Sequence, residues 1–462
     1  MGTSAIVGRR RTRSGRARFL SAGTVGALAI LLSISLYGCT GSGATPPIIY
    51  VTPTPGPATP TPPPTVAPTP NPTDTPTPAP TDTPTPVATT PATPKPTGTP
   101  GPGHFVATGS MGQSRVWATA TRLNNGFVLV AGGAGHAGGV PVVSAELYNP
   151  STGKFAFTGS LNQARMYHTA TLLPDGRVLV SGGQGSAGTA IGSAELYDPA
   201  TGKFTVTGSM LFARSRFTAG LLPDGRVLMA GGRSATGAAQ AAAETYSPTS
   251  GHFSSTSPLA TARYDHTATR LADGRILVVG GTNGLARTIA SSEIYTPATN
   301  HWSASGSLNQ GRGGMTASML SNGNALLTGG YAYCPGVNPV PPDAVCFDAA
   351  LSSAEIYTTS SGVFTTTASM ADVRGADSTW FTASWLPDGR ILIAGGGNHS
   401  GVTLATTTLY DLVHAKFYAA GPMSTPRQGH VAASLGDGRV LVAGGWDLAS
   451  GKSFATAELY VP

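Results

Sequence analysis

Short apolar runs that end in a pair of glycines recur along most of the chain. The seven pairs begin at residues 132, 182, 231, 280, 329, 395 and 444, with spacings of 50, 49, 49, 49, 66 and 49 residues. An Asn-Gly or Asp-Gly dipeptide precedes every run, at Asn125, Asp175, Asp224, Asp273, Asn322, Asp388 and Asp437. Such a dipeptide between two apolar runs favours a tight type I′ turn. We therefore predict that the first two strands of each unit, a and b, form a β-hairpin.

A tyrosine follows each glycine pair after a variable loop. Six of the seven tyrosines have an aromatic residue seven positions later, in the pairs Tyr148 and Phe155, Tyr197 and Phe204, Tyr246 and Phe253, Tyr295 and Trp302, Tyr357 and Phe364, and Tyr410 and Phe417. Tyr460 has none, but the segment HFVATGSM at residues 104–111 matches KFTVTGSM at 203–210 and precedes the first unit. We predict an all-β, seven-bladed β-propeller with four strands (a, b, c and d) in each blade, whose last sheet is closed by the N-terminal strand.

The repeated pattern of apolar run, glycine pair, loop, Tyr and a later Trp or Phe resembles the kelch repeat, and the resemblance covers residues 104–462. The segment YHTATLLPDGRVLVSGG at 167–183 is more similar to the propeller of the galactose oxidase family. That resemblance implies a copper held by two Tyr and two His, with one Tyr cross-linked to a Cys. Only Tyr167-His168 matches the motif, and no segment after the seventh unit supplies the remaining His. We expect neither a metal nor another cofactor.

Two charged residues repeat with the blades. Arg occurs at the expected start of strand a in all seven units, at Arg115, Arg165, Arg214, Arg263, Arg312, Arg374 and Arg427. Glu stands two residues before the tyrosine in six units, at Glu146, Glu195, Glu244, Glu293, Glu355 and Glu458, while the sixth unit has Thr408. A packing motif needs a copy in every blade and a single ligand site does not. We therefore interpret these residues as structural ion pairs, and the equivalent His168, His266 and His430 as structural histidines.

Composition separates the first hundred residues from the repeats. Of 38 prolines, 22 lie between Pro46 and Pro102, and six of the 28 Lys and Arg residues lie in the first 18 positions. From residue 104 onward, 21 basic residues face 19 acidic ones, so the propeller is nearly neutral. The excess of positive charge therefore indicates a targeting segment and not a nucleic-acid partner.

The first 39 residues are typical of an export signal. Six arginines precede 20 uncharged residues at 19–38, and Leu-Tyr-Gly-Cys at 36–39 resembles a bacterial lipobox, which implies lipidation of Cys39. An uncleaved signal anchor and an ordinary cleaved signal are the alternatives. All three predict export of the rest of the chain.

Residues 40–103 form a Pro/Thr-rich segment that has almost no large apolar side chains and is unable to build a core. Its prolines favour an extended polyproline II conformation, so we predict a disordered stalk between the anchor and the propeller. Its Thr-Pro density also permits O-glycosylation.

The repeat is interrupted in blades 5 and 6. The b–c loop of blade 5 holds 24 residues where blades 2, 3 and 4 hold 11, and it contains Cys334 and Cys346, for which we predict a disulfide. In blade 6, Arg374 stands 21 residues before its glycine pair instead of 17. In an antiparallel blade, b–c loops and d–a connections emerge at one face, so we expect the two insertions to be neighbours there.

Aromatic and acidic side chains of these insertions and their neighbours are the candidate binding residues. They are Tyr331, Tyr333, Asp343, Phe347, Asp348, Asp372, Arg374, Asp377, Trp380, Asn398, His399, Trp446 and Asp447. Aromatic rings beside carboxylates suit sugar stacking or a protein partner. We expect a monomeric, exported and membrane-tethered binding protein that recognises an extracellular glycan or protein. The alternatives are an extracellular carbohydrate-acting enzyme and a structural envelope protein.

Overall fold

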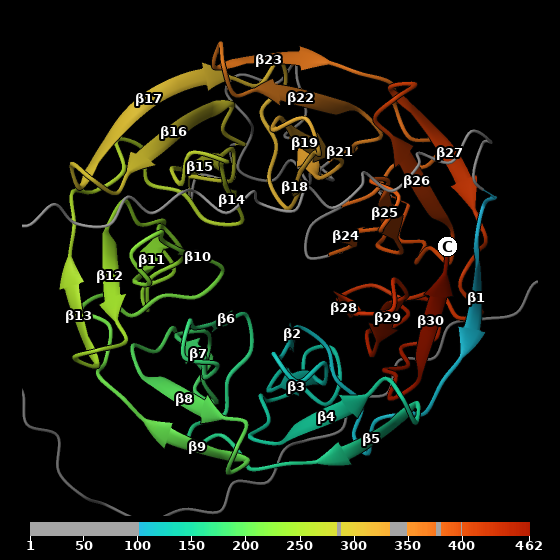
Figure 1. Ribbon diagram of the computed structural model, residues 1–462, viewed down its shortest axis with the longest axis horizontal. Helices are drawn as coiled ribbons and strands as arrows, with labels where there is room; N and C mark the ends of the chain where they lie inside the picture. The colour runs from blue at the N-terminus through green and yellow to red at the C-terminus, as the bar shows by residue number, and fades with distance from the viewer. Residues whose placement is uncertain (1–100, 284–287, 333–348, 376–379, 399) are drawn as a thin grey trace, which may run out of the picture. The chain divides into compact units, whose positions relative to one another are not determined.

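A computed structural model describes residues 101–283, 288–332, 349–375, 380–398 and 400–462. These residues form seven four-stranded antiparallel sheets arranged as the blades of a ring (Figure 1). The predicted fold class is confirmed. The predicted anchor, with Cys39, and almost all of the predicted stalk lie outside the described residues. No helix in the described part of the chain is long and apolar enough to span a membrane.

The strands follow the chain in the order a, b, c, d within each blade. Blade 1 comprises β2 (Thr119–Arg122), β3 (Val128–Ala131), β4 (Ala145–Asn149) and β5 (Lys154–Phe157). Blade 2 comprises β6 (Thr169–Leu172), β7 (Val178–Ser181), β8 (Ala194–Asp198) and β9 (Lys203–Val206). Blade 3 comprises β10 (Thr218–Leu221), β11 (Val227–Ala230), β12 (Ala243–Ser247) and β13 (His252–Ser255). Blade 4 comprises β14 (Thr267–Arg270), β15 (Ile276–Val279), β16 (Ser291–Thr296) and β17 (His301–Ser307). Blade 5 comprises β18 (Thr316–Met319), β19 (Ala325–Thr328), β22 (Ala354–Thr358) and β23 (Val363–Thr366). Blade 6 comprises β24 (Thr382–Trp385), β25 (Ile391–Ala394), β26 (Thr407–Asp411) and β27 (Lys416–Ala420).

Blade 7 joins the two ends of the propeller. It comprises β28 (Val431–Ser434), β29 (Val440–Ala443), β30 (Ala457–Val461) and, as its outermost strand, β1 (His104–Ala107). Phe105 pairs with Tyr460, and the two rings lie 5.2 Å apart, in the place of the aromatic pairs found inside the other blades. The predicted closure by the N-terminal strand is confirmed.

The hydrophobic core lies between neighbouring blades. Every residue of each b strand is buried, because the blades on both sides cover it. This double burial explains why the b strands have continuous apolar sequences such as VLVA, whereas a strand with one solvated face alternates. One core cluster, for example, combines Leu129 of blade 1 with Val178 and Val180 of blade 2.

The a–b turns differ from the prediction. A type I′ turn requires positive φ at both central residues, but only the glycine of each dipeptide has one, as in Gly126 with φ 87°. Gly126 N donates to Leu123 O at 3.0 Å, and Leu123 N donates to Phe127 O at 2.8 Å. The connection is therefore a three-residue loop with glycine in the left-handed position. The Asn125 side chain adds a bond to the backbone N of Phe127 at 3.1 Å.

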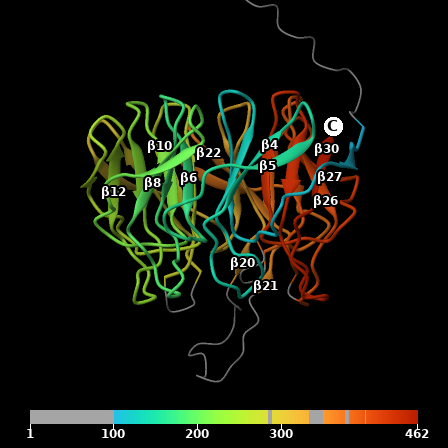
Figure 2. The ribbon, with the colours of Figure 1, turned by 90° about the horizontal axis from the view of Figure 1, so that it is seen from below.

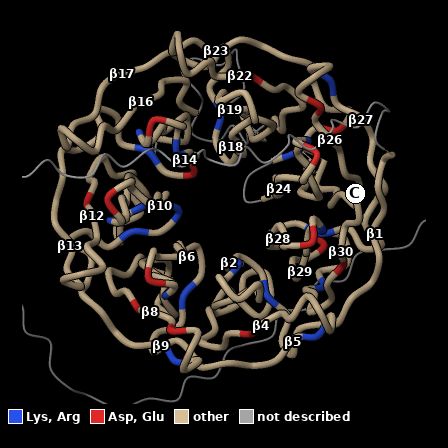
Figure 3. The backbone as a smooth tube through the Cα atoms, viewed as in Figure 1, with Lys and Arg blue, Asp and Glu red and all other residues tan. Residues whose placement is uncertain are grey.

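The repeated arginines lie in the d–a connections and not at the first residue of strand a as predicted. They stand four residues before strand a in six blades, and eight residues before it in blade 6, where Arg374 precedes β24. In every blade Nη1 of the arginine donates to the carbonyl of the first glycine of the pair and to a carbonyl just before strand c; for Arg165 these are Gly182 O at 2.8 Å and Ser193 O at 2.9 Å. Nη2 of Arg165 contacts Glu195 at 2.8 Å, and five other blades have the same ion pair. The structural interpretation of these charges is confirmed. Figure 3 shows acidic and basic positions side by side in the blades.

Blade 6 satisfies its arginine differently, because Thr408 replaces the glutamate. Nη2 of Arg374 contacts Asp372 at 3.1 Å and the Thr408 hydroxyl at 3.3 Å. Burial lowers the pKa of Arg374 to about 10, against the opposing effect of Asp372. Arg374 still carries its charge at neutral pH.

Loss of one buried glutamate should destabilise the propeller strongly. Glu244 and Arg214 are fully buried, so Glu244→Gln leaves a buried guanidinium without its counter-charge, and we expect a loss of about 3–5 kcal/mol in the free energy of unfolding. Urea unfolding measures this loss. Asp224→Asn, which removes an exposed ion pair with Arg226, is the matched control and should cost less than about 1 kcal/mol. Equal small losses in both variants would contradict the structural role of the buried pair.

Candidate functional site

One position in each d–a connection lines the central opening at the face that carries the b–c loops. In six blades it stands two residues after the repeated arginine, and in blade 6 Trp380 takes the place. We call these residues the mouth ring: Trp117, Tyr167, Arg216, Asp265, Gly314, Trp380 and Gly429. Backbone hydrogen bonds of 2.8–3.3 Å link neighbouring members, as from Arg216 N to Tyr167 O and from Gly429 N to Trp380 O. The b–c face is the lower one in Figure 2, where β20 (Tyr331–Ala332) and β21 (Ala349–Ala350) lie.

Four members of the mouth ring have a left-handed backbone conformation, which residues other than glycine rarely adopt. Trp117, Tyr167, Arg216 and Asp265 have φ of 50–56°, and the glycines Gly314 and Gly429 have φ of 61° and 62°. A residue other than glycine in this region costs on the order of 1–3 kcal/mol. Glycine would be the stable choice at all six positions. The strain at four of them indicates that these side chains are retained for function.

The mouth ring varies where the scaffold repeats. Each blade has the same arginine and glycine pair, whereas the seven positions of the mouth ring hold five different residue types. Packing motifs repeat with the fold, but a ligand site at the axis is asymmetric because a single ligand meets each blade differently. The sequence therefore contained a usable signal for this site, namely variation at a fixed position of a strict repeat.

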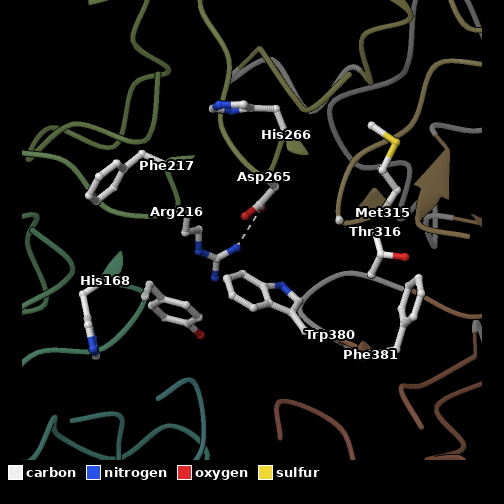
Figure 4. Close-up of a pocket in the computed structure, with 11 residues that line it drawn as sticks. His168, Arg216, Phe217, Asp265, His266, Met315, Thr316, Trp380 and Phe381 are labelled. Atoms are coloured by element: carbon white, nitrogen blue, oxygen red, sulfur yellow. Dashed lines mark hydrogen bonds and ion pairs between the residues drawn. The ribbon is translucent and has the colours of Figure 1, made fainter. Parts of the chain in front are cut away.

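A cavity of about 190 Å³ opens inside the mouth ring (Figure 4). Tyr167, Arg216, Asp265 and Trp380 line it at the mouth, and His168, His266 and Phe381 line it more deeply. Enclosed sites for drug-sized ligands measure roughly 300–1,000 Å³. This cavity therefore fits one small ring or one side chain, with the rest of a larger ligand outside.

Arg216 lies at the centre of the site. Its guanidinium contacts the Asp265 carboxylate at 3.1 Å, and it lies 4.5 Å from the centre of the Tyr167 ring and 6.0 Å from that of Trp380. Figure 4 shows the ion pair and the indole of Trp380 beside it. Asp265 also accepts a bond from the Tyr331 hydroxyl at 3.4 Å. Aromatic faces and a carboxylate thus hold the cation in one orientation.

Aromatic side chains surround the ion pair. Tyr167 lies 4.8 Å from Trp117 and 5.3 Å from Trp380, between ring centres. A methyl group added at Gly429 would lie 3.1 Å from Trp117 Nε1 and 3.6 Å from Trp446 Cδ1, so both indoles flank this glycine. The indole N–H groups of Trp117, Trp380 and Trp446 are buried and have no hydrogen-bond partner within the described residues. Most buried polar groups in proteins are paired, so these three indoles stand out among the residues in and beside the mouth ring.

The three equivalent histidines support the blades. Nε2 of His168, His266 and His430 lies 2.9–3.0 Å from a threonine hydroxyl of the preceding blade. Burial, together with the positive charge of neighbouring buried arginines, lowers the pKa of each ring to about 3. The rings are therefore neutral in the fold. Their equivalent hydrogen bonds agree with the predicted structural role.

The structure brings some of the predicted binding residues together. Trp380 belongs to the mouth ring, and Tyr331 and Trp446 lie beside it. The adjacency of the two insertions is visible at their described ends, where Leu351 bridges to Arg374.

Other predicted residues lie elsewhere. Arg374 is completely buried and Asp372 serves as its counter-ion, so both belong to the scaffold of blade 6. The side chains of Asn398 and Asp447 accept bonds from the backbone of their own loops. The remaining predicted residues lie outside the described residues: Tyr333, Asp343, Phe347, Asp348, Asp377, His399 and the predicted disulfide partners Cys334 and Cys346. The repeat interruptions alone did not predict Trp117, Tyr167, Arg216 or Asp265 as ligand contacts.

Comparisons with known proteins agree with this architecture. The Kelch motif matches residues 263–309. A fungal alcohol oxidase of the AA5 family, solved in complex with copper, is 18% identical, with a TM-score of 0.61 over 78% of this chain and 76% of the oxidase. The protein YjhT is 12% identical, with a TM-score of 0.54 over 68% of this chain and 99% of YjhT. A search of curated protein sequences found no match.

The fold and the repeat thus define a kelch-type seven-bladed β-propeller. Its architecture is similar to that of galactose oxidase-like propellers, and at these identities the likeness concerns the fold alone.

The mouth ring does not fit a copper ion of the kind present in the oxidase. Within the described ranges, no three His, Cys, Asp or Glu side chains are grouped so that they could hold a metal. The Nε2 atoms of His168 and His266 already face threonine hydroxyls. The Arg216 guanidinium covers the Tyr167 ring at 4.5 Å, and its charge would oppose a nearby cation. We therefore derive no copper chemistry from these residues.

Stability should fall as the pH is lowered from about 6.5 to about 3, because His168, His266 and His430 bind protons only after unfolding in this range. In the middle of the range, each histidine adds about 1.4 kcal/mol per pH unit to the dependence of unfolding free energy on pH. His266→Gln should reduce that slope by this amount. Urea unfolding at several pH values measures it, with the exposed His252→Gln as control. An unchanged slope in His266→Gln would show that His266 is protonated in the fold.

Proposed function

We propose that this protein is an exported, membrane-tethered binding protein that recognises an extracellular glycan through the mouth ring. The observation that supports this proposal is the convergence of Tyr167, Trp380 and the ion pair of Arg216 and Asp265 on one cavity. Tyr167, Arg216 and Asp265 have strained backbones, and the residue type at this position varies between blades, which distinguishes the site from the scaffold.

The chemistry of the site suits a sugar ring. Aromatic faces pack against the C–H faces of sugars, while the carboxylate of Asp265 matches their hydroxyl groups. A protein ligand would insert a single side chain into the same cavity. The cavity volume of about 190 Å³ accommodates either, and the polar groups within it favour the sugar.

Binding explains the site better than glycoside hydrolysis does. Hydrolysis of a glycosidic bond usually requires two carboxyl groups on opposite sides of the bond. Asp265 is the only carboxylate among the residues that line the cavity in the described part of the chain, and Arg216 holds it as an ion pair. A single ion-paired carboxylate is suited to accept hydrogen bonds from a ligand.

Trp380→Ala should weaken glycan binding at least tenfold, because an aromatic side chain in the centre of a site commonly contributes about 2 kcal/mol or more. A glycan array identifies a ligand and calorimetry gives its affinity. Trp385→Ala is the matched control, since Trp385 is 38% exposed at the other end of strand β24, near the a–b turn. Unfolding midpoints verify that both variants fold. Equal affinity of Trp380→Ala and the parent would exclude the mouth ring as the glycan site, and binding of a protein without any glycan would assign the other ligand class.

The tether has its own test. If Cys39 carries the lipid, radiolabelled palmitate should enter the protein in cells, and Cys39→Ala should abolish labelling and release the chain from the membrane fraction. Labelling that persists in Cys39→Ala would contradict lipidation at this residue. Membrane retention without labelling would favour the signal anchor.

A further inference from the structure

A second pocket of about 240 Å³ lies next to the mouth ring, between the b–c loops of blades 2 and 3. Its walls include Gln184, Thr189, Ser215, Arg216, Arg233 and Ser234. Arg216 lines both this pocket and the mouth cavity. The two pockets therefore adjoin at Arg216, so a ligand in the mouth cavity has a neighbouring pocket within reach.

The backbone fixes the second cation, Arg233, beside the first. Arg233 N donates to Ser215 O at 2.7 Å, and Ser215 N donates to Arg233 O at 3.0 Å, so Arg233 is held opposite the residue that precedes Arg216. Its Nε donates to Gly237 O at 3.0 Å, and its guanidinium lies 5.9 Å from the centre of the Tyr264 ring. Arg233 is exposed, which leaves its charge accessible to a ligand.

The charges and hydroxyls of this pocket favour an anion. Two arginines and several residues with hydroxyl or amide side chains line it, and no acidic residue does so among the described residues. Asp265 pairs with Arg216 from the mouth cavity and balances its charge. The positive charge of Arg233 has no balancing acidic residue in the described lining of the pocket. Guanidinium groups bind carboxylate and sulfate oxygens with paired N–H donors.

The residue type at the position of Arg233 differs from blade to blade, as it does in the mouth ring. The residue that directly follows the glycine pair is Ala134, Gln184, Arg233, Thr282, Tyr331, Gly397 or Trp446. Only one of the seven is charged, and it stands in the same blade as Arg216. The positive charge is therefore confined to one side of the opening.

We propose that the pocket between blades 2 and 3 is an anionic subsite, so that the ligand is an acidic glycan. The sugar ring occupies the mouth cavity against Tyr167 and Trp380, and its carboxylate or sulfate group contacts Arg233 and the outer side of Arg216. This inference rests on the proposed glycan binding and adds the charge of the ligand. Electrostatic attraction also makes the affinity depend on ionic strength.

The test compares matched sugars by calorimetry on the folded protein. The probes are glucuronic acid, glucose 6-sulfate and neutral glucose, each at low and high salt, with disaccharides of the same composition as a second set. The charged sugars should bind more tightly than glucose, with an affinity that falls as salt rises. Arg233→Gln should weaken binding of the charged sugars about tenfold and leave that of glucose unchanged. The stronger of the two charged probes identifies the group as a carboxylate or a sulfate.

Arg270→Gln is the control for loss of one positive charge, because Arg270 is exposed at the a–b end of strand β14, away from this pocket. It should change none of the affinities. Equal affinities for charged and neutral sugars, or an equal effect of Arg233→Gln on both, would overturn the anionic subsite and leave glycan binding intact. If no sugar binds and Trp380→Ala has no effect on the array, both proposals fail together.

Discussion

The buried arginine of each blade is the interaction on which the rest of the structure depends. Its guanidinium joins the d–a connection to two carbonyls of the b–c loop and, in six blades, to a glutamate. The cost of burying this charge is offset only while all of these bonds are made. The same bonds fix the backbone two residues later, where the mouth ring begins. The scaffold therefore determines where the mouth-ring side chains lie, while their chemistry varies between blades.

The mouth ring shows how a regular scaffold can hold an irregular site. Scaffold positions are occupied by the residues that stabilise them, whereas Trp117, Tyr167, Arg216 and Asp265 occupy a conformation that glycine would adopt at lower cost. Such local strain is common at functional sites, because the surrounding fold supplies enough stability to maintain it. Gly314 and Gly429 mark the places where the opening has no side chain.

Sequence periodicity predicted the fold because every blade repeats the same local rules. The apolar b strands, the Tyr and aromatic pairs and the displaced first strand were sufficient to predict seven blades and their closure. The turn type was predicted incorrectly, because Asp-Gly serves both a two-residue turn and the three-residue loop observed at Gly126. Four of the five mouth-ring side chains were missed for a different reason. The insertions predicted Trp380 as a binding residue. Contacts such as that between Arg216 and Tyr167 join different blades, and a linear sequence does not specify which side chains of two blades face each other.

The closure of blade 7 determines when folding can finish. Strand β1 is made first and its partner β30 is made last, so the pairing of Phe105 with Tyr460 joins opposite ends of the propeller sequence. Contacts between such distant residues form slowly, because a long loop must close before they stabilise anything. A growing chain can assemble single blades as they emerge, but strand β1 remains without its partner until β30 has been made. The closed ring thus requires every strand from β1 to β30, and a chain that stops before β30 leaves its seventh sheet open.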